Sequence, residues 1–380
     1  INRGGEKVYP RDVERQWAAA GVHAVAVAVP AGDFGHEIGA VADGTDPRVL
    51  DTLAELPHLR PATAWLAEPI TTATGKPRRA EMARGLVAHP HPPDRYAGLL
   101  AYALACARRL LDDPARPRTA QACALTAQAA LLVARCGSAV PATEPGADRS
   151  PAHDALDLLV AHWAEFAAGA LTGEELIKRQ PRLWTRLMTE WPMGDYARLA
   201  ADVVRARRLP GAPVLELGTG VGNTTRLLAD ELGEQLVWSD RSAALVARGG
   251  WPGRGLVLDF DAELPPEVGR PGTVFACNAL HCSAAPAAAL RRLAAALRPG
   301  GVLVLGEGAT PTHPDGIPWA LDYLFCMFDG WWDRSGFRPR SEWLRLISDA
   351  GFVRPGYAAL RYGRHDCGGV LWAYRPEEAP

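Results

Sequence analysis

The sequence predicts an α/β fold whose second half is a parallel, doubly wound sheet, and two observations carry this prediction. Short strand-like runs alternate with helix-length segments from residue 213 onward, and a glycine-rich loop directly follows the first run. Such alternation is typical of parallel strands joined by crossover helices. The expected strands lie at 213–217, 235–239, 255–258, 273–276 and 302–305, and the clearest helix lies at 286–297.

Two further regions precede this sheet. Residues 1–90 mix short apolar runs at 23–30 and 37–41 with helical stretches, which indicates a small α/β unit. Residues 91–210 contain few strand candidates, and their Ala/Leu-rich segments favour helices at 96–111, 119–136 and 154–168. Between the last two, residues 137–151 are rich in Gly, Ser, Pro and Thr and predict a flexible linker. The chain therefore divides into 1–90, 91–210 and 211–380.

The composition excludes several classes of protein. Hydrophobic residues make up 48% of the 380, enough for buried cores, and the formal net charge of −2 gives no reason to expect nucleic acid or an anionic membrane as partner. No apolar run reaches the roughly 18–20 residues that span a bilayer, and the amino end resembles neither a signal nor a transit peptide. The seven cysteines form no CxxC pair, so we expect no metal site, no disulfide framework and a cytoplasmic location.

A glycine-rich segment at 214–225 is the strongest single motif. It reads Val-Leu-Glu-Leu-Gly-Thr-Gly-Val-Gly-Asn-Thr-Thr, an apolar strand that runs into Gly218, Gly220 and Gly222. Glycine lets the backbone turn sharply and approach a ligand, and the amino terminus of the following helix presents free N–H groups. A glycine triplet alone is also compatible with a dinucleotide site or with a loop that holds no ligand.

The residues around this loop favour one ligand. The spacing Gly-x-Gly-x-Gly is tighter than the dinucleotide fingerprint, and Glu216 stands two residues before the first glycine. Asp240 ends the next expected strand, where a carboxylate can hold two ribose hydroxyls. Asp259 and Phe260 end the third, and offer a carboxylate for an adenine amino group beside an aromatic face. Together these positions resemble the S-adenosylmethionine (SAM) site of class I SAM-dependent methyltransferases.

Later motifs sharpen the resemblance. In chain order they read Asn-Ala-Leu-His-Cys-Ser at 278–283, Leu-Arg-Pro-Gly-Gly at 297–301, Leu-Gly-Glu-Gly at 305–308 and Phe-Asp-Gly-Trp-Trp at 328–332. Over residues 155–375 the chain resembles the C-methyltransferase domains of polyketide synthases, with a looser match to their helical lid at 169–177. The resemblance implies a Rossmann-like sheet with a helical lid, SAM as cofactor, and a substrate tethered to the phosphopantetheine of an acyl- or peptidyl-carrier protein.

The resemblance also implies roles for individual residues. A His–Glu pair performs catalysis in that family, and the matching positions are His281 and Glu307. Tyr196, Trp331 and Trp332 are expected to bind substrate, although two adjacent tryptophans also fit core or lid packing. The expected cofactor-binding residues are Glu216, Gly218, Gly220, Gly222, Asp240, Asp259, Phe260 and Asn278.

Methylation at carbon is chemistry that a His–Glu pair suits. Carbon is a poor nucleophile until a proton leaves, so methylation beside a thioester needs a base and stabilisation of the enolate. Imidazole titrates near neutrality, and a carboxylate can fix its tautomer and favour its charged form. The alternative is that His281 is a loop residue and Glu307 a surface acid. Cys282, next to His281, suggests a nucleophilic thiol, but methyl transfer needs none.

Residues 1–85 resemble a second family. The segment at 1–14 reads Ile-Asn-Arg-Gly-Gly-Glu-Lys-Val-Tyr-Pro-Arg-Asp-Val-Glu, and the segment at 72–79 reads Thr-Ala-Thr-Gly-Lys-Pro-Arg-Arg. Both resemble motifs of the small α+β carboxyl-terminal subdomain of adenylate-forming enzymes, in which the lysine of the second motif lies over the acyl adenylate. Here that lysine is Lys76. The large ATP-binding domain of that family would precede residue 1, so we expect a piece of a longer synthetase, or else a subdomain retained as a docking surface.

The sequence thus predicts part of a modular polyketide or nonribosomal peptide synthetase that serves natural product biosynthesis. An adenylation-type subdomain is followed by a helical connector and lid and then by a SAM-dependent C-methyltransferase that acts on a carrier-bound, β-ketoacyl-like thioester. Three alternatives remain open. The chain could methylate nitrogen or oxygen of an aminoacyl group or small molecule, act as a non-catalytic scaffold, or retain ligase activity with a separate large adenylation domain.

Overall fold

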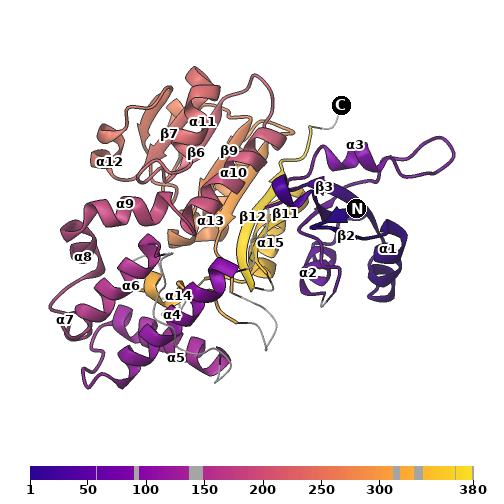
Figure 1. Cartoon of the computed structure of the whole chain (residues 1–380). Helices are drawn as coiled ribbons and strands as arrows, with labels where there is room; N and C mark the ends of the chain where they lie inside the picture. The colour runs from indigo at the N-terminus through magenta and orange to yellow at the C-terminus, as the bar shows by residue number, and fades with distance from the viewer. Residues whose placement is uncertain are drawn as a thin grey trace.

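A mixed β-sheet with helices on both faces organises the chain (Figure 1). The computed structural model describes residues 1–56, 58–89, 94–136, 149–310, 317–328, 337–363 and 365–378. Within these ranges the sheet has ten strands in the order β3-β4-β5-β11-β12-β10-β9-β6-β7-β8. Their bounds are β3 Ala24–Pro30, β4 His36–Ala42, β5 Thr63–Leu66, β6 Val214–Leu217, β7 Leu236–Asp240, β8 Arg254–Val257, β9 Thr273–Cys277, β10 Val302–Glu307, β11 Val353–Tyr362 and β12 His365–Tyr374.

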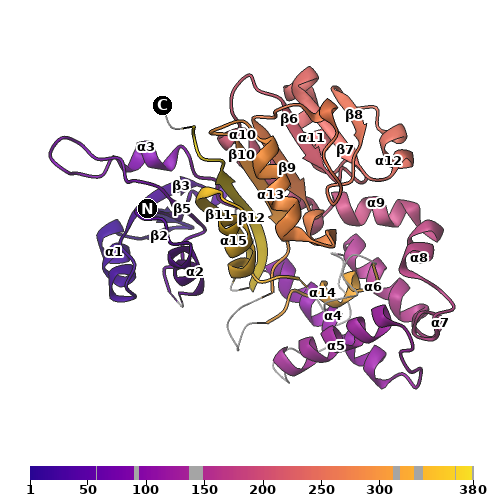
Figure 2. The ribbon, with the colours of Figure 1, turned by 180° about the vertical axis from the view of Figure 1, so that it is seen from behind.

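The five strands expected after residue 213 are all present, as β6 to β10, and they pair in parallel. Every residue of β6, β9 and β10 is buried, as expected for strands covered on both faces. One face is covered by α10 (Met193–Arg207) and α11 (Thr225–Leu232), and the other by α13 (Pro286–Ala296) and α15 (Arg340–Asp349). Figure 2 shows the second face; α12 (Ala243–Arg248) lies beside β7 and β8 at the edge.

The prediction of a wholly parallel sheet is wrong at its centre. β11 and β12 form an antiparallel hairpin, and β12 is inserted antiparallel beside β10. Neither strand was predicted, because glycine, proline and charged residues interrupt the apolar pattern of 353–374. Their burial depends on neighbouring strands and helices rather than on local sequence.

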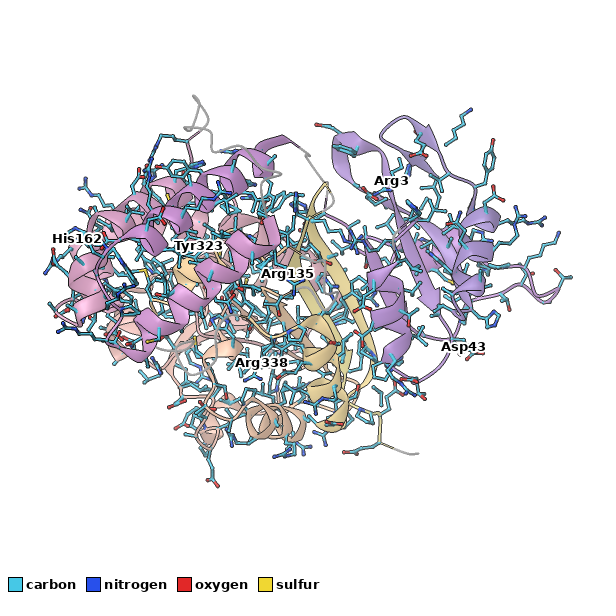
Figure 3. The ribbon with its side chains drawn as sticks, turned by 90° about the horizontal axis from the view of Figure 1, so that it is seen from below. Arg3, Asp43, Arg135, His162, Tyr323 and Arg338 are labelled. Atoms are coloured by element: carbon cyan, nitrogen blue, oxygen red, sulfur yellow. The ribbon has the colours of Figure 1, made fainter. Side chains whose placement is uncertain are left out.

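The amino-terminal residues extend the same sheet. The runs at 23–30 and 37–41 are strands, as expected, and β5 joins them to the edge of the later sheet by pairing antiparallel with β11. Figure 3 shows this unit, with Arg3 and Asp43, on the opposite side of the β11–β12 hairpin from His162 and Tyr323. The unit also contains β1 (Asn2–Arg3), β2 (Glu6–Lys7), α1 (Pro10–Ala19), α2 (Arg48–Glu55) and α3 (Arg79–Ala83).

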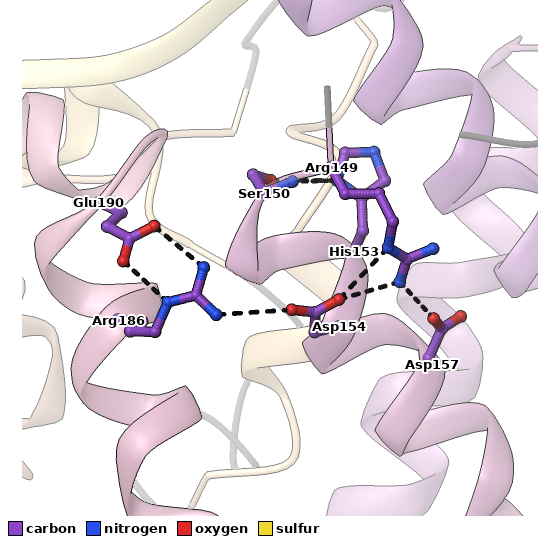
Figure 4. A network of polar contacts seen from close by, with 7 residues as sticks. All are labelled: Arg149, Ser150, His153, Asp154, Asp157, Arg186 and Glu190. Carbon is purple, nitrogen blue, oxygen red and sulfur yellow. Dashed lines mark hydrogen bonds and ion pairs between the residues drawn. The ribbon is translucent and has the colours of Figure 1, made fainter. Parts of the chain in front are cut away.

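Helices gathered beside the carboxyl ends of the parallel strands form the helical lid. The helix expected at 154–168 is divided at His162 into α6 and α7, and residues 137–148 of the expected linker lie outside the described ranges. Arg186 of α9 pairs with Asp154 of α6, and Asp154 also pairs with Arg149, which lies just before α6 (Figure 4). The lid helices are α4 Asp94–Asp112, α5 Ala120–Cys136, α6 Pro151–Ala161, α7 Trp163–Ala168, α8 Gly173–Arg179, α9 Pro181–Thr189 and α14 Asp322–Phe325.

In the part of the chain that the structure describes, no helix combines the length and the apolar character needed to cross a membrane.

Candidate active site

The glycine loop lies at the carboxyl end of β6 and leads into α11. Gly218, Gly220 and Gly222 all have positive φ, between 54° and 74°, a region that side chains other than glycine rarely adopt. At Gly222 an added Cβ would also lie 1.9 Å from the Trp251 ring. The loop therefore requires glycine for backbone conformation and for space, which leaves its backbone close to whatever binds at this edge.

Glu216 lies under this loop rather than beside it. The side chain is buried, and its Oε2 accepts a hydrogen bond of 2.7 Å from the Thr225 hydroxyl. The Thr225 hydroxyl also contacts the Thr219 hydroxyl. Burial is the main cause that raises the pKa of Glu216 to about 8, and the nearby Asp240 carboxylate adds to it. Its visible contacts hold the loop and the start of α11 together; direct contact with a cofactor stays a prediction.

The other expected cofactor residues reach the same edge. Asp240 ends β7, and its two carboxylate oxygens accept hydrogen bonds from the N–H groups of Gly220 at 3.0 Å and Ser242 at 2.9 Å. Asp259 is exposed just beyond β8, and Asn278 follows β9 with a φ of +51°. Parallel strands have their carboxyl ends at the same side of the sheet, so Asp240 and Asn278, 38 positions apart in sequence, lie around one loop. Phe260, half-buried, follows Asp259.

This arrangement suits SAM. The glycine loop and the start of α11 offer backbone N–H groups for a carboxylate, and Asp240 is a carboxylate that can accept from ribose hydroxyls. Asp259 is exposed and can accept from an adenine amino group. No described group of three or more His, Cys, Asp or Glu side chains could hold a metal ion.

His281 and Glu307 lie next to this loop and contact one another. Nδ1 of His281 is 2.7 Å from Oε2 of Glu307, and Oε1 of Glu307 accepts a hydrogen bond from the Leu280 N–H at 3.0 Å. Glu307 is the last residue of β10 and is only 1% exposed, whereas His281 lies in a short 3-10 turn after β9. The surface-acid alternative for Glu307 does not fit this burial.

The charge state of His281 follows from its neighbours. Burial alone would lower the pKa of His281, but Cys282 and Glu307 raise it to about 10, and Cys282 also hydrogen-bonds the imidazole. A buried carboxylate beside an imidazole favours the imidazolium. The pair is therefore built to hold a proton on His281.

Of the remaining expected residues, Tyr196 and Lys76 lie in different parts of the fold. Tyr196 is completely buried in α10, where its hydroxyl donates to the carbonyl of Cys367 and its ring meets Trp319. Lys76 is exposed in a turn after β5, closed by a hydrogen bond from the Thr72 N–H to the Lys76 carbonyl at 2.9 Å. Trp331 and Trp332 lie outside the described residues.

The Lys76 turn and the His281–Glu307 pair lie beyond opposite ends of the strands of the sheet. β5 runs antiparallel to β11, whereas β10 and β11 both run antiparallel to β12. The carboxyl end of β5, which leads to Lys76, therefore faces away from the carboxyl end of β10. Figure 1 shows the turn beyond α3 at the edge remote from the lid.

Phe337 also lies at the site, although no sequence pattern predicts it. Its ring meets the His281 imidazole edge-on, with centroids 5.8 Å apart, and also contacts Trp319 and Phe325. The residue is buried and precedes α15, 56 positions after His281 in the chain. No motif surrounds it, so only the folded chain brings it to the site.

Comparisons with known sequences point to the same chemistry. Residues 187–353 match the family model of a methyltransferase domain. A non-reducing polyketide synthase of Penicillium shearii is 31% identical over 177 residues, which are 42% of this chain and 8% of that synthase. The lovastatin diketide synthase of Aspergillus terreus is 33% identical over 150 residues, 35% of this chain and 6% of that one. The chain spans less than a tenth of the length of these curated relatives.

Solved structures share the fold. The CMeT domain of the citrinin polyketide synthase has a TM-score of 0.59 at 18% identity and covers 74% of this chain and 89% of its own. The trans-methyltransferase CalH in complex with SAH has a TM-score of 0.57 at 18% identity, covering 75% and 93%. The sheet thus has the fold of these methyltransferase structures, and residues 187–353 match a methyltransferase domain.

Proposed function

We propose that the chain is the C-methyltransferase of a modular synthetase and methylates the activated carbon of a carrier-bound, β-ketoacyl-like thioester. The observation that carries the proposal is the buried His281–Glu307 pair, 2.7 Å apart, beside the glycine loop. Methylation of an amine needs no such base, because the nitrogen lone pair is already nucleophilic. The sequence similarity to polyketide synthases supports the same acceptor class.

In the proposed mechanism, His281 removes a proton from the carbon between the ketone and the thioester. Nδ1 is engaged by Glu307, so Nε2 takes the proton, and the C–H electron pair passes into the enolate. The Glu307 carboxylate stabilises the imidazolium that forms, and the Leu280 N–H holds that carboxylate in place. SAM, when bound, supplies the electrophilic methyl group to the carbanion.

The lid offers an apolar surface for the acyl chain. A groove lies between α6, α8, α9 and α14, and among the described residues it is lined by apolar side chains and by Gln180. Aromatic rings connect this groove to the catalytic pair: Phe328 lines it and contacts Phe325, which contacts Phe337 against His281. The apolar groove suits an acceptor with a hydrocarbon chain, and the packed rings join the residues that line it to His281.

The proposal is tested with a panel of pantetheine thioesters incubated with SAM. Acyl, β-ketoacyl and aminoacyl thioesters are compared by mass spectrometry, and fragmentation locates the added methyl group. A methyl group on the carbon between the two carbonyls is expected. Transfer to the aminoacyl nitrogen alone would overturn the proposal in favour of an N-methyltransferase, and SAM binding without transfer to any acceptor would leave a scaffold.

The raised pKa of His281 predicts how the imidazole titrates with and without SAM. The imidazole accepts a proton only when neutral, and a pKa of about 10 keeps it protonated at neutral pH in the cofactor-free chain. Its NMR titration should therefore have a midpoint near 10. We expect saturating SAM to lower that midpoint, because a nearby positive charge disfavours the imidazolium. A midpoint near the ordinary 6.5 without SAM would contradict the pairing.

The raised pKa of His281 also makes the stability of the folded chain depend on pH. The folded-state pKa lies above the ordinary value, so the pair stabilises the fold fully below pH 6.5, and this contribution is lost as the pH rises toward 10. Glu307→Gln should remove this loss of stability with rising pH, measured by chemical unfolding. Glu377 is an exposed acid near the carboxyl end, and Glu377→Gln should leave the pH dependence intact.

Replacement of Cys282 should change the titration of His281 without abolishing methyl transfer. Because the Cys282 side chain hydrogen-bonds the imidazole and raises its pKa, Cys282→Ala should move the His281 midpoint toward neutrality. Methyl transfer should persist, since the thiol takes no part in the proposed chemistry. Cys123→Ala is the control, because Cys123 is also exposed but lies on α5. Complete loss of transfer in Cys282→Ala would instead indicate a nucleophilic role.

For the amino-terminal unit we propose descent from the carboxyl-terminal subdomain of an adenylate-forming enzyme, with Lys76 as its lysine and a large adenylation domain as its partner. The exposed, hydrogen-bonded turn around Lys76 supports this assignment. Mixing the chain with such a large domain should restore adenylate formation, measured by pyrophosphate exchange. Equal exchange with Lys76→Ala would contradict the role of Lys76.

A further inference from the structure

The junction between the amino-terminal unit and the methyltransferase sheet is made of buried backbone. β5 pairs with β11 from Thr63 to Trp65, and the buried Thr63 hydroxyl donates to the Tyr357 carbonyl at 2.9 Å. The Trp65 indole N–H donates to the Arg354 carbonyl at 3.1 Å. An edge strand such as β11 would otherwise present unpaired N–H and C=O groups, so residues 1–89 cover an edge that needs a partner.

Arg207, near the end of α10, joins three elements at this junction. Its guanidinium carbon lies 4.1 Å from the centre of the Trp65 ring and 4.6 Å from that of Trp372, and Nη1 donates to the Tyr374 hydroxyl at 3.3 Å. The residue is 8% exposed, and burial lowers its pKa. Trp65 comes from the amino-terminal unit, and the other two aromatic residues come from β12.

The positive charge of Arg207 is stabilised by the faces of two aromatic rings, those of Trp65 and Trp372, rather than by a carboxylate. No carboxylate among the described residues lies within ion-pair distance of it, and Nη2 meets no hydrogen-bond acceptor there. Burying a cation is costly unless its surroundings stabilise it, and aromatic faces do so when water is excluded. Separation of Trp65 from Trp372 would remove one of the two faces, so the contact favours the joined arrangement.

The β11–β12 hairpin extends from this junction to the catalytic edge. Gly369 of β12 is the register partner of Glu307, and the Cys367 carbonyl accepts the Tyr196 hydroxyl hydrogen bond. At the end of β11, the Tyr362 hydroxyl donates to Asp195 of α10 at 2.7 Å. The strand that pairs with the catalytic glutamate thus has its other end between Arg207 and the amino-terminal unit.

We propose that residues 1–89 are a fixed part of the methyltransferase, held to its edge strand by the Arg207–Trp65–Trp372 contact, and that they support the strand that positions Glu307. The unit does not move as an independent domain relative to the sheet. Arg207 is a positioning residue in this proposal and touches neither cofactor nor acceptor. The inference does not depend on which atom of the acceptor is methylated.

The test is hydrogen exchange of the full chain, read by mass spectrometry, in Arg207→Ala and in Arg205→Ala. Arg205 lies on the same helix but is exposed and paired with Asp202 and Glu231, which makes it a matched control. We expect the amides of β5 and β11 to exchange about tenfold to thirtyfold faster in Arg207→Ala, as loss of a desolvated cation–π contact implies. Amides of β7, at the far side of the sheet, should be unchanged.

Two further variants and the unfolding of the wild-type chain keep the proposal falsifiable if Arg207→Ala folds poorly. Arg207→Lys keeps the charge and most of the volume and should give an intermediate exchange rate, and Trp65→Leu should reproduce the loss without touching α10. The wild-type chain should unfold in one transition. Exchange in Arg207→Ala equal to that in Arg205→Ala, or a separate early unfolding transition of residues 1–89, would overturn the proposal.

Discussion

Replacement of His281 with alanine should lower the kcat of methyl transfer to a β-ketoacyl thioester by about 10²–10⁴-fold, the usual contribution of a positioned general base. No other described titratable side chain takes the place of the imidazole between Glu307 and Phe337. SAM affinity should change little, because none of the expected cofactor contacts, from the glycine loop, Asp240, residues 259–260 and Asn278, involves the imidazole. Steady-state kinetics and calorimetry measure the two quantities separately.

Glu307→Gln provides the matched control for this prediction. The amide keeps the size of the side chain and can still accept from the Leu280 N–H, but it cannot stabilise the imidazolium. Its kcat should fall less than that of His281→Ala, and the loss should grow as the pH rises toward 10, where the wild-type imidazole also becomes neutral. Unchanged kcat in both variants would remove the pair from the mechanism.

Gly222→Ala should weaken SAM binding by at least about tenfold. The left-handed backbone at this position, with φ +74°, costs about 1–2 kcal/mol for a residue with a Cβ. The new Cβ would in addition lie 1.9 Å from the Trp251 ring, which is held by an edge-on contact with Trp238, at 5.2 Å between centroids. The loop must shift to accommodate it, and the shift displaces the backbone that faces the cofactor.

Gly211→Ala separates the two causes. Gly211 has a similar φ of +71°, but nothing lies within 4 Å of an added Cβ. It should lose some stability in thermal unfolding and keep its SAM affinity, measured by calorimetry. If Gly222→Ala bound SAM as Gly211→Ala does, the loop would not be the cofactor cradle.

The parts of the fold that the sequence predicted are those with local signals. The strands β6 to β10 are short, mostly apolar runs, and the hydrophobic pattern locates them. The motif residues of the site follow for the same reason, because they lie at or shortly after the carboxyl ends of these strands. His281 and Glu307 were predicted as a pair only through the resemblance, and the fold then brings them to 2.7 Å.

The parts that escaped prediction depend on distant residues. Strand β11 carries Pro355 and Gly356, and β12 carries Gly368 and Gly369; they are strands because β5 and β10 pair with them on either side. Phe337 and Arg207 have no local motif, and their contacts come from chain segments tens to more than a hundred residues away. The continuity of the sheet across residues 1–89 likewise follows from the edge pairing of β11 and from no pattern within the unit itself.

Exchange of the acceptor's α-proton with solvent deuterium shows directly whether His281 acts as the base. A β-ketoacyl thioester is incubated with the chain in heavy water without SAM, so that proton removal is observed apart from methyl transfer. The account predicts faster deuterium incorporation at the carbon between the carbonyls with the wild-type chain, and the uncatalysed rate with His281→Ala. Equal incorporation with both, while only the wild-type chain methylates, would contradict the role of His281 as the base.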